Sequence, residues 1–157
     1  MHSVKYAEAV LVHAELTVAA VVCVDHRYLV VEEFAHGRRV INQPAGHVEP
    51  GETLQQAVIR ETFEESAWRF TPTGLVGMYH WPHEDGRTTL RFAFCGEVEG
   101  HVAGQALDDG IIAAHWLSAE QLQARNDLRS PLVLQAIADF NAFEPIALER
   151  VRHIRGR

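Results

Sequence analysis

Three glutamates spaced to share one face of a helix carry the most chemical information in this sequence. Glu61, Glu64 and Glu65 lie in the segment 46–68, which is typical of a turn followed by an amphipathic helix. On a helix that turns about 100° per residue, their carboxylates fall within an arc of roughly 100°. Because like charges this close repel each other unless a cation lies among them, the spacing predicts a bound cation. Ligands that are all oxygen favour Mg²⁺, Mn²⁺ or Ca²⁺ over zinc.

The helix that positions these carboxylates has clear signals of its own. Thr53 stands three residues before Gln56, which is the spacing of a capping box. An inward-facing stripe is formed by Leu54, Ala57, Val58 and Thr62. The carboxylates lie beside this stripe in the C-terminal half of the helix, where negative charge opposes the helix dipole. Their position therefore also favours a compensating ligand.

Several strand-like segments surround this helix. The segments rich in β-branched and aromatic residues are 15–24, 27–34, 74–82, 88–100 and 111–117. Turns at 25–26 and 84–87 predict antiparallel hairpins, 36–39 predicts a polar loop, and Pro44 and Gly46 limit 40–48 to a short strand. Two further helices are indicated by start signals at Ser118 and Pro131. Strands outnumber helices, so we expect an α+β sandwich with a mixed sheet.

Length and charge restrict the classes of function. The 157 residues suit one domain, 1–157, whose lead-in (1–14) and Arg-rich end (145–157) are the least defined parts. A formal net charge of −7 argues against a nucleic-acid polymer as partner. The four arginines of the last eight residues suit either a solvated end of the chain or a phosphate- or partner-binding tail.

Two further features of the sequence indicate the cellular compartment of the protein. Apolar runs end well before the roughly 18 residues of a membrane span, and the N-terminus lacks the pattern of an export signal. Cys23 and Cys95 both lie in strand-like apolar runs, where buried, reduced thiols are more common than a disulfide. We therefore expect a cytoplasmic protein that has no membrane partner.

The helix and the turn before it match a known pattern. Gly46 is followed after five residues by Glu52, then after seven by Arg60-Glu61, and then after two by Glu64-Glu65. This spacing resembles the Nudix box in its charged positions and its first Gly. Thr62 and Ala67 depart from the pattern, in place of an aliphatic residue and of a Gly. The resemblance implies a Nudix-type α/β/α sandwich that hydrolyses a nucleoside diphosphate linked to another group with Mg²⁺, or with Mn²⁺ as a substitute.

Shorter strings extend the resemblance over roughly residues 16–137. The strings LVVEE, NQPAGH, MYHW, LRF and NDLRSPLV resemble the NudJ-type phosphatases of bacteria. That resemblance implies release of phosphate from nucleoside di- and triphosphates and from thiamine-related pyrophosphates such as hydroxymethylpyrimidine pyrophosphate. Two alternatives stay open. One is a pyrophosphatase that cleaves the internal bridge of ADP-ribose or a similar compound, and the other is a ligand-binding sensor without turnover.

The family pattern implies roles for the charged residues of the box. Glu64 and Glu65 are expected as metal ligands, together with the carbonyl of Ala45 or Gly46. Glu61 is expected as a further ligand or as the base that deprotonates water, because clustered carboxylates titrate together. The carboxylates are expected to be oriented by Arg60 and Glu52. A distal carboxylate is expected from Asp108 or Asp109, although loop aspartates also commonly form turns.

Substrate contacts are expected outside the box. Tyr79 or Trp81 can stack on a base or pyrimidine ring, although aromatic residues in strands more often belong to the core. Arg91 alternates with apolar neighbours in its strand, so it suits either a phosphate contact or a solvent-facing position. The candidate substrate-binding residues are Gln43, Tyr79, His80, Trp81 and Arg91.

Overall fold

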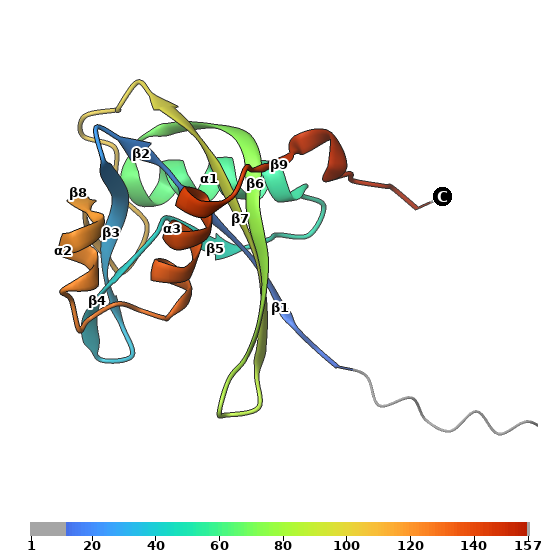
Figure 1. Cartoon of the computed structure of the whole chain (residues 1–157), viewed down its shortest axis with the longest axis horizontal. Coiled ribbons are helices and arrows are strands. Elements are labelled where there is room, and N and C mark those ends of the chain that lie inside the picture. The colour runs from blue at the N-terminus through green and yellow to red at the C-terminus, as the bar shows by residue number, and fades with distance from the viewer. Residues whose placement is uncertain (1–11, 157) are drawn as a thin grey trace, which may run out of the picture.

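Two β-sheets form the frame of the molecule (Figure 1), whose computed structural model describes residues 12–156. The first sheet has the order β5 (Ala45–His47), β1 (Glu15–Val21), β7 (Thr88–Glu99), β6 (Arg69–Pro82) and β9 (Ile146–Ala147). The second joins β2 (Cys23–Val24), β3 (Arg27–Ala35) and β4 (Arg38–Asn42), with β8 (Ile111–Ser118) on the other edge of β3. β1 runs parallel to β7, whereas β5 and β6 run antiparallel to their partners. The prediction of a mixed sheet is therefore confirmed.

Helices cover both faces of the first sheet (Figure 1). The helices are α1 (Leu54–Ser66), α2 (Ala119–Gln123), α3 (Leu132–Ala142) and the short 3₁₀ helix η1 (Leu148–Arg150). Side chains alternate along β1, so Val18 packs in one buried cluster with Val58 of α1, and Val21 packs in another with Ile137 of α3. The strand is thus buried on both faces. This arrangement confirms the predicted α/β/α sandwich.

The segment 15–24 does not form one hairpin strand, contrary to the sequence-based expectation. Only Cys23 and Val24 pair with β3 as β2, across a turn in which Asp25 and His26 have φ angles of 48° and 60°. The preceding β1 pairs with β7 in the other sheet. A local turn pattern carries no information on this parallel pairing, because the partner lies more than 70 residues away in the sequence.

Two other element bounds differ from the prediction. The polar loop 36–39 is only a tight turn, because Arg38 already pairs with Ala35 in β4. β6 begins at Arg69 rather than at residue 74, and its register with β7 shifts near Pro72 and again near Leu75. Such irregularities accommodate Pro and Gly inside a long strand.

Helix α1 has the predicted start and an unusual end. The Thr53 hydroxyl accepts a 3.1 Å hydrogen bond from the Gln56 N–H, and the Gln56 side chain accepts one of 2.9 Å from the Thr53 N–H. The capping box is therefore confirmed. At the other end Ala67 has a φ of 60°, in the left-handed region that glycine adopts most easily. The chain thus ends this helix with a Gly-like conformation at an alanine.

The C-terminal region is ordered around a short strand. β9 pairs with β6 through Ala147 and Ile146, and Leu148 and Val151 pack against the buried cluster that contains Phe94. The predicted lead-in 1–14 falls largely on residues outside the described range, as does Arg157.

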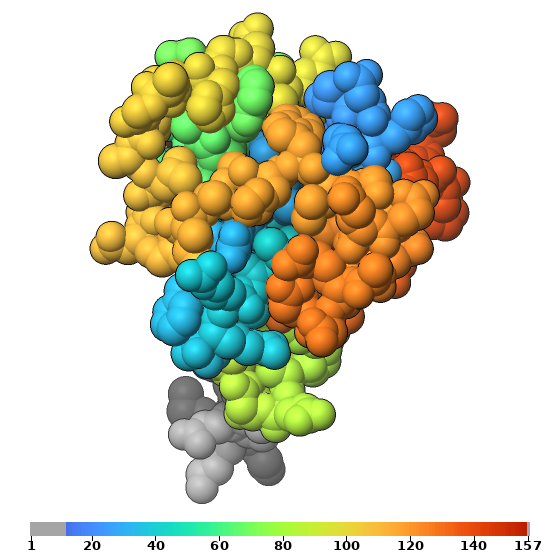
Figure 2. Space-filling view, turned by 90° about the vertical axis from the view of Figure 1, so that its left-hand side faces the viewer, coloured from blue at the N-terminus to red at the C-terminus, as the bar shows by residue number. Residues whose placement is uncertain are grey.

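Figure 2 shows α2 and the segment after it, in orange, beside the turn between β3 and β4, in blue to cyan.

The cysteine prediction is confirmed for one residue only. Cys95 is buried and Cys23 is half-buried, and both are free thiols. Among residues 12–156, none of the helices combines the length and the apolar character that crossing a membrane requires.

Candidate active site

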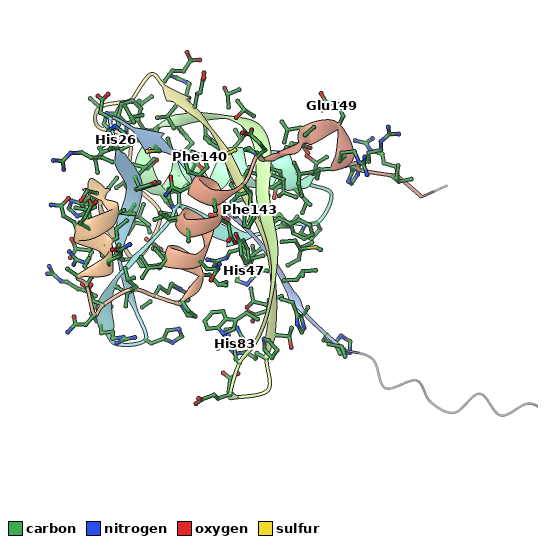
Figure 3. The ribbon with its side chains drawn as sticks, in the orientation of Figure 1. His26, His47, His83, Phe140, Phe143 and Glu149 are labelled. Atoms are coloured by element: carbon green, nitrogen blue, oxygen red, sulfur yellow. The ribbon has the colours of Figure 1, made fainter. Side chains whose placement is uncertain are left out.

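A cavity of about 410 Å³ lies between α1, the first sheet and the segment that leads into α3. Its volume falls in the range of small-molecule sites. Its wall includes Glu61 and Glu65 of α1, Arg91 and Thr89 of β7, and Ser130 before α3. His47 and His83 also line it, and both lie on the side of the β6–β7 hairpin that faces α3 (Figure 3). The cavity thus combines acidic and basic groups.

The acidic part of the wall comes from the buried carboxylates of α1. Glu61 and Glu65 are each 7% exposed, and the Ala45 N–H donates a 2.9 Å hydrogen bond to Oε2 of Glu65. Burial raises the pKa of Glu65 to about 8, and the charge of Glu61 acts in the same direction. Burial also raises the pKa of the Glu61 carboxyl above its usual range. A cation at this wall would offset both the desolvation and the repulsion.

The oxygen atoms of three carboxylates converge beside this wall. Glu61, Glu64 and Asp108 each offer an oxygen, and these atoms lie within 4.8 Å of one another. The loop is held there because the Asp108 N–H donates a 2.9 Å hydrogen bond to the Glu64 carbonyl. An all-oxygen set of this size fits Mg²⁺ or Mn²⁺. Asp108 thus approaches the glutamates, whereas its neighbour Asp109 is not part of the cavity wall.

Arg60 connects the carboxylates of the box to one another. Its guanidinium donates to both carboxylate oxygens of Glu52, at 2.6 and 3.0 Å. Nη1 lies 2.8 Å from an oxygen of Glu61 and 3.0 Å from one of Glu64, and Nη2 donates to the His47 carbonyl. The hydrogen bonds from Arg60 lower the pKa of the Glu52 carboxyl below its usual range. This arrangement restricts the rotamers of Glu61 and Glu64.

Gly46 allows α1 to approach strand β5 closely. A Cβ atom built at Gly46 would overlap the carboxylate of Glu61. The Gly at this position of the box pattern therefore has a steric reason in this chain. Ala45 and Gly46 both line the cavity. A metal contact from one of their carbonyls remains a prediction.

Two of the expected substrate-binding residues lie in the cavity wall. Arg91 is only 8% exposed, so it does not face solvent, and its Nε donates a 3.3 Å hydrogen bond to Oγ1 of Thr17. Burial lowers its pKa to about 10. Trp81 lines the cavity beside His83, with ring centroids 3.9 Å apart. These positions suit an anion contact and a stacking contact.

The other three expected substrate-binding residues lie outside the described cavity wall. Tyr79 donates a 2.8 Å hydrogen bond to Asp139 of α3, and burial raises its pKa above the usual range. His80 points to the opposite side of the strand and is exposed. Gln43 is 1% exposed and donates a 3.0 Å hydrogen bond to the Val133 carbonyl. Tyr79 and Gln43 thus hold α3 against the sheets.

The sequence-based interpretation missed several residues of the cavity wall. Arg129 and Ser130 lie in the string NDLRSPLV, which carried part of the family resemblance but was given no role. The other missed residues lie in β-strands, where no sequence motif marks a single polar residue as part of a site. They are Thr17, Glu33, Asn42 and Thr89. Only the fold brings them together.

Known proteins share both the sequence pattern and the fold. The family model described as "NUDIX domain" matches residues 13–136. The chain is 38% identical over 136 residues to Phosphatase NudJ of Escherichia coli strain K12, covering 87% of this chain and 89% of the relative. A NUDIX hydrolase structure from Nitrosomonas europaea has a TM-score of 0.88 at 41% identity, covering 90% of this chain and 98% of that one. The E. coli ORF135 protein has a TM-score of 0.65 at 26% identity, covering 83% and 93%.

Proposed function

This chain belongs to the Nudix hydrolase family, whose members act on phosphoric anhydrides, and we propose that it releases phosphate in an Mg²⁺-dependent reaction. The proposed substrates are nucleoside di- and triphosphates, thiamine-precursor pyrophosphates such as hydroxymethylpyrimidine pyrophosphate, or both. The name of the E. coli relative, a phosphatase, supports release of phosphate over cleavage of an internal bridge.

One observation carries the proposal. The carboxylate oxygens of Glu61, Glu64 and Asp108 lie within 4.8 Å of one another, beside a cavity that also contains the buried Arg91. A diphosphate group carries several negative charges, and hydrolysis needs those charges neutralised as water attacks phosphorus. Carboxylates for a divalent cation and a guanidinium for phosphate oxygens meet that requirement in one cavity.

The proposed roles follow from the contacts of each residue. Glu61, Glu64 and Asp108 would hold Mg²⁺, and Glu65, near enough for the charges of Glu61 and Asp108 to raise its pKa, would be a further ligand. The bound ion would polarise phosphoryl oxygens and activate water. Arg60 keeps Glu61 and Glu64 oriented through hydrogen bonds of 2.8 and 3.0 Å. Arg91 attracts the anionic part of the substrate into the cavity. These residues work mainly by positioning and charge neutralisation.

Proton transfer can be provided by a carboxylate of the same wall. Glu61 is buried beside the converging oxygens, and burial raises its pKa above the usual range of a carboxyl. A general base accepts protons most effectively when its pKa lies near the working pH. We therefore propose Glu61 as the group that accepts a proton from the attacking water, in addition to its ligand role.

A phosphate-release screen in the presence of Mg²⁺ tests this function. The panel contains nucleoside di- and triphosphates, hydroxymethylpyrimidine pyrophosphate, thiamine diphosphate and ADP-ribose. Direct appearance of orthophosphate supports the proposal, whereas nucleoside monophosphate plus a phosphorylated fragment supports a pyrophosphatase. No turnover of any anhydride would indicate a ligand-binding sensor.

Site variants connect that activity to the acidic wall. We expect Glu64→Gln to abolish Mg²⁺-dependent hydrolysis while the circular dichroism spectrum stays unchanged. Glu84→Gln is the matched control, because Glu84 is exposed at the tip of the β6–β7 hairpin and does not line the cavity. Normal activity of the Glu64 variant would overturn the assignment.

The cellular compartment is also part of the proposal. Cys23 and Cys95 are free thiols in the structure. Free thiols suit a reducing compartment, so we propose that the enzyme acts in the cytoplasm.

A further inference from the structure

Within residues 12–156, three buried side-chain atoms of the cavity wall lack hydrogen-bond partners. These atoms are Nη1 of Arg91, Oγ of Ser130 and Oδ1 of Asn42, of which the first two can donate a hydrogen bond. Arg91 is 8% exposed and Ser130 is 7% exposed, and both line the cavity. A buried polar group without a partner is unfavourable, and native structures contain few of them. The two donors indicate that a ligand group with acceptor oxygens completes their hydrogen bonds.

The chain beyond Ser130 adds further donors. Helix α3 begins immediately after Pro131, and no side chain caps its N-terminus. The N–H groups of a first helical turn carry partial positive charge and bind anions, and in α3 the Val133 N–H already donates a 3.3 Å hydrogen bond to the Ser130 carbonyl. Gln43 holds this turn in place, because its side-chain amide donates a 3.0 Å hydrogen bond to the Val133 carbonyl. The start of α3 is therefore fixed beside the cavity.

Two guanidinium groups lie in this part of the wall, and only one of them forms an ion pair within residues 12–156. Within the described part of the chain, Arg91 forms no ion pair, although Glu33 and Glu65 lie near enough to raise its pKa against the effect of burial. Arg129 also lines the cavity, with Nη1 2.8 Å from a carboxylate oxygen of Glu33. A buried guanidinium is costly unless an anion compensates it. The missing partner is thus an anion with several acceptor oxygens.

We propose that Arg91, Ser130 and the N-terminus of α3 form a subsite for the terminal phosphate of the substrate. The inference rests on the proposed function and deepens it, because it assigns residues to the terminal phosphate that all the proposed substrates carry. A terminal phosphate has three unesterified oxygens and a higher charge than a bridging phosphate, so it can satisfy the guanidinium, the hydroxyl and the helix N–H groups together. The subsite therefore selects diphosphates with one free end over those esterified at both ends.

Binding of ADP and of ADP-ribose tests this selection. The two compounds share the ADP group, but only ADP ends in a free phosphate. Isothermal titration calorimetry in EDTA measures both affinities without hydrolysis. We expect the wild-type enzyme to bind ADP about tenfold more tightly than ADP-ribose, and Arg91→Gln and Ser130→Ala each to lose most of that preference. Arg39→Gln is the matched control, because Arg39 is exposed and pairs with Glu32 outside the cavity.

The outcomes separate this inference from the proposed function. Equal affinity of the wild-type enzyme for both compounds, or no ADP binding at all, overturns the subsite. An unchanged preference in Ser130→Ala also overturns it, and this variant removes only one oxygen atom if Arg91→Gln fails to fold. Wild-type hydrolysis with Mg²⁺ is scored separately. An enzyme that prefers ADP in EDTA but cleaves no anhydride retains the subsite and loses the proposed function.

Discussion

The backbone N–H of Ala45 donates a 2.9 Å hydrogen bond to Oε2 of Glu65, which joins strand β5 to helix α1 at the wall of the cavity. Within residues 12–156 no basic side chain forms an ion pair with Glu65, and Arg60 instead pairs with Glu52, Glu61 and Glu64. Glu65, whose pKa burial raises to about 8, thus has no ion-pair partner within the described residues. Its ionisation should be coupled to both stability and metal binding.

The stability of the metal-free protein should depend on pH through Glu65. Its pKa is about 8 in the folded protein against 4.5 as the ordinary value, so the folded state retains a proton that the unfolded state has lost. The stabilising contribution is complete below pH 4.5 and is lost as the pH rises through about 8. Denaturant unfolding in EDTA at pH 6 and pH 9 measures the loss.

Glu65→Gln provides the comparison for this prediction. The amide oxygen can still accept the hydrogen bond from Ala45, but the side chain cannot ionise. We expect the variant to lose less stability than the wild type between pH 6 and pH 9, and saturating Mg²⁺ to reduce the loss in the wild type. An equal loss in both proteins without metal would show that Glu65 does not titrate in this range.

Arg60→Lys should weaken metal binding while retaining the positive charge. A lysine cannot donate to Glu52, Glu61 and Glu64 together, because it lacks the planar guanidinium. Loss of such orienting contacts typically lowers metal affinity about 10–100-fold. Titration of the metal-free protein with Mn²⁺, followed by electron paramagnetic resonance, measures the change. Arg39→Lys controls for the substitution, and equal affinities would leave Arg60 with a purely structural role.

Neighbouring aspartates allow a matched test of the distal carboxylate. Asp108 lies with Glu61 and Glu64, whereas Asp109 lies outside the cavity wall. We expect Asp108→Asn to raise the Mg²⁺ concentration needed for half-maximal hydrolysis by about tenfold or more, and Asp109→Asn to change it little. Similar effects of both substitutions would indicate a general charge effect rather than a ligand.

Gly46→Ala should damage the site through a steric conflict. The added Cβ would overlap the carboxylate of Glu61, so either the side chain or strand β5 must move. A misplacement of about 1 Å in a catalytic group can reduce turnover about 100-fold. Steady-state kinetics measure the loss. Gly156→Ala, where an added Cβ meets no atom within 4 Å, is the control.

Ala67→Gly should stabilise the end of helix α1. A left-handed conformation costs an L-residue roughly 1–2 kcal/mol, and glycine avoids this cost. Ala67 is 3% exposed, so loss of its methyl group offsets about 0.8 kcal/mol of the gain. We expect a net increase of at most about 1 kcal/mol in the free energy of unfolding, measured by urea denaturation, with kcat unchanged. A large decrease would indicate that methyl packing outweighs the backbone strain.

Local patterns predicted those parts of the site that depend on one continuous segment. The capping box at Thr53 and the shared face of Glu61, Glu64 and Glu65 follow from helix geometry, which repeats over a few residues. The pairing of β1 with β7 was not predictable in this way, because no local periodicity encodes the register of strands so far apart. The same limit explains why Tyr79 and Gln43 were expected at the substrate but lie against α3.

The sequence by itself determined the family and the acidic face of α1, and it predicted a divalent cation, because these depend on the types and spacing of residues within 46–68. Only the tertiary structure decided which loop aspartate approaches that face and which residues place positive charge in the same cavity. Arg91 and Ser130 are 39 residues apart in the chain, and they line one cavity only because α3 starts beside the sheet that carries β7. Residues so far apart in the chain meet only through tertiary packing, and the local spacing of residues in the sequence does not encode that packing.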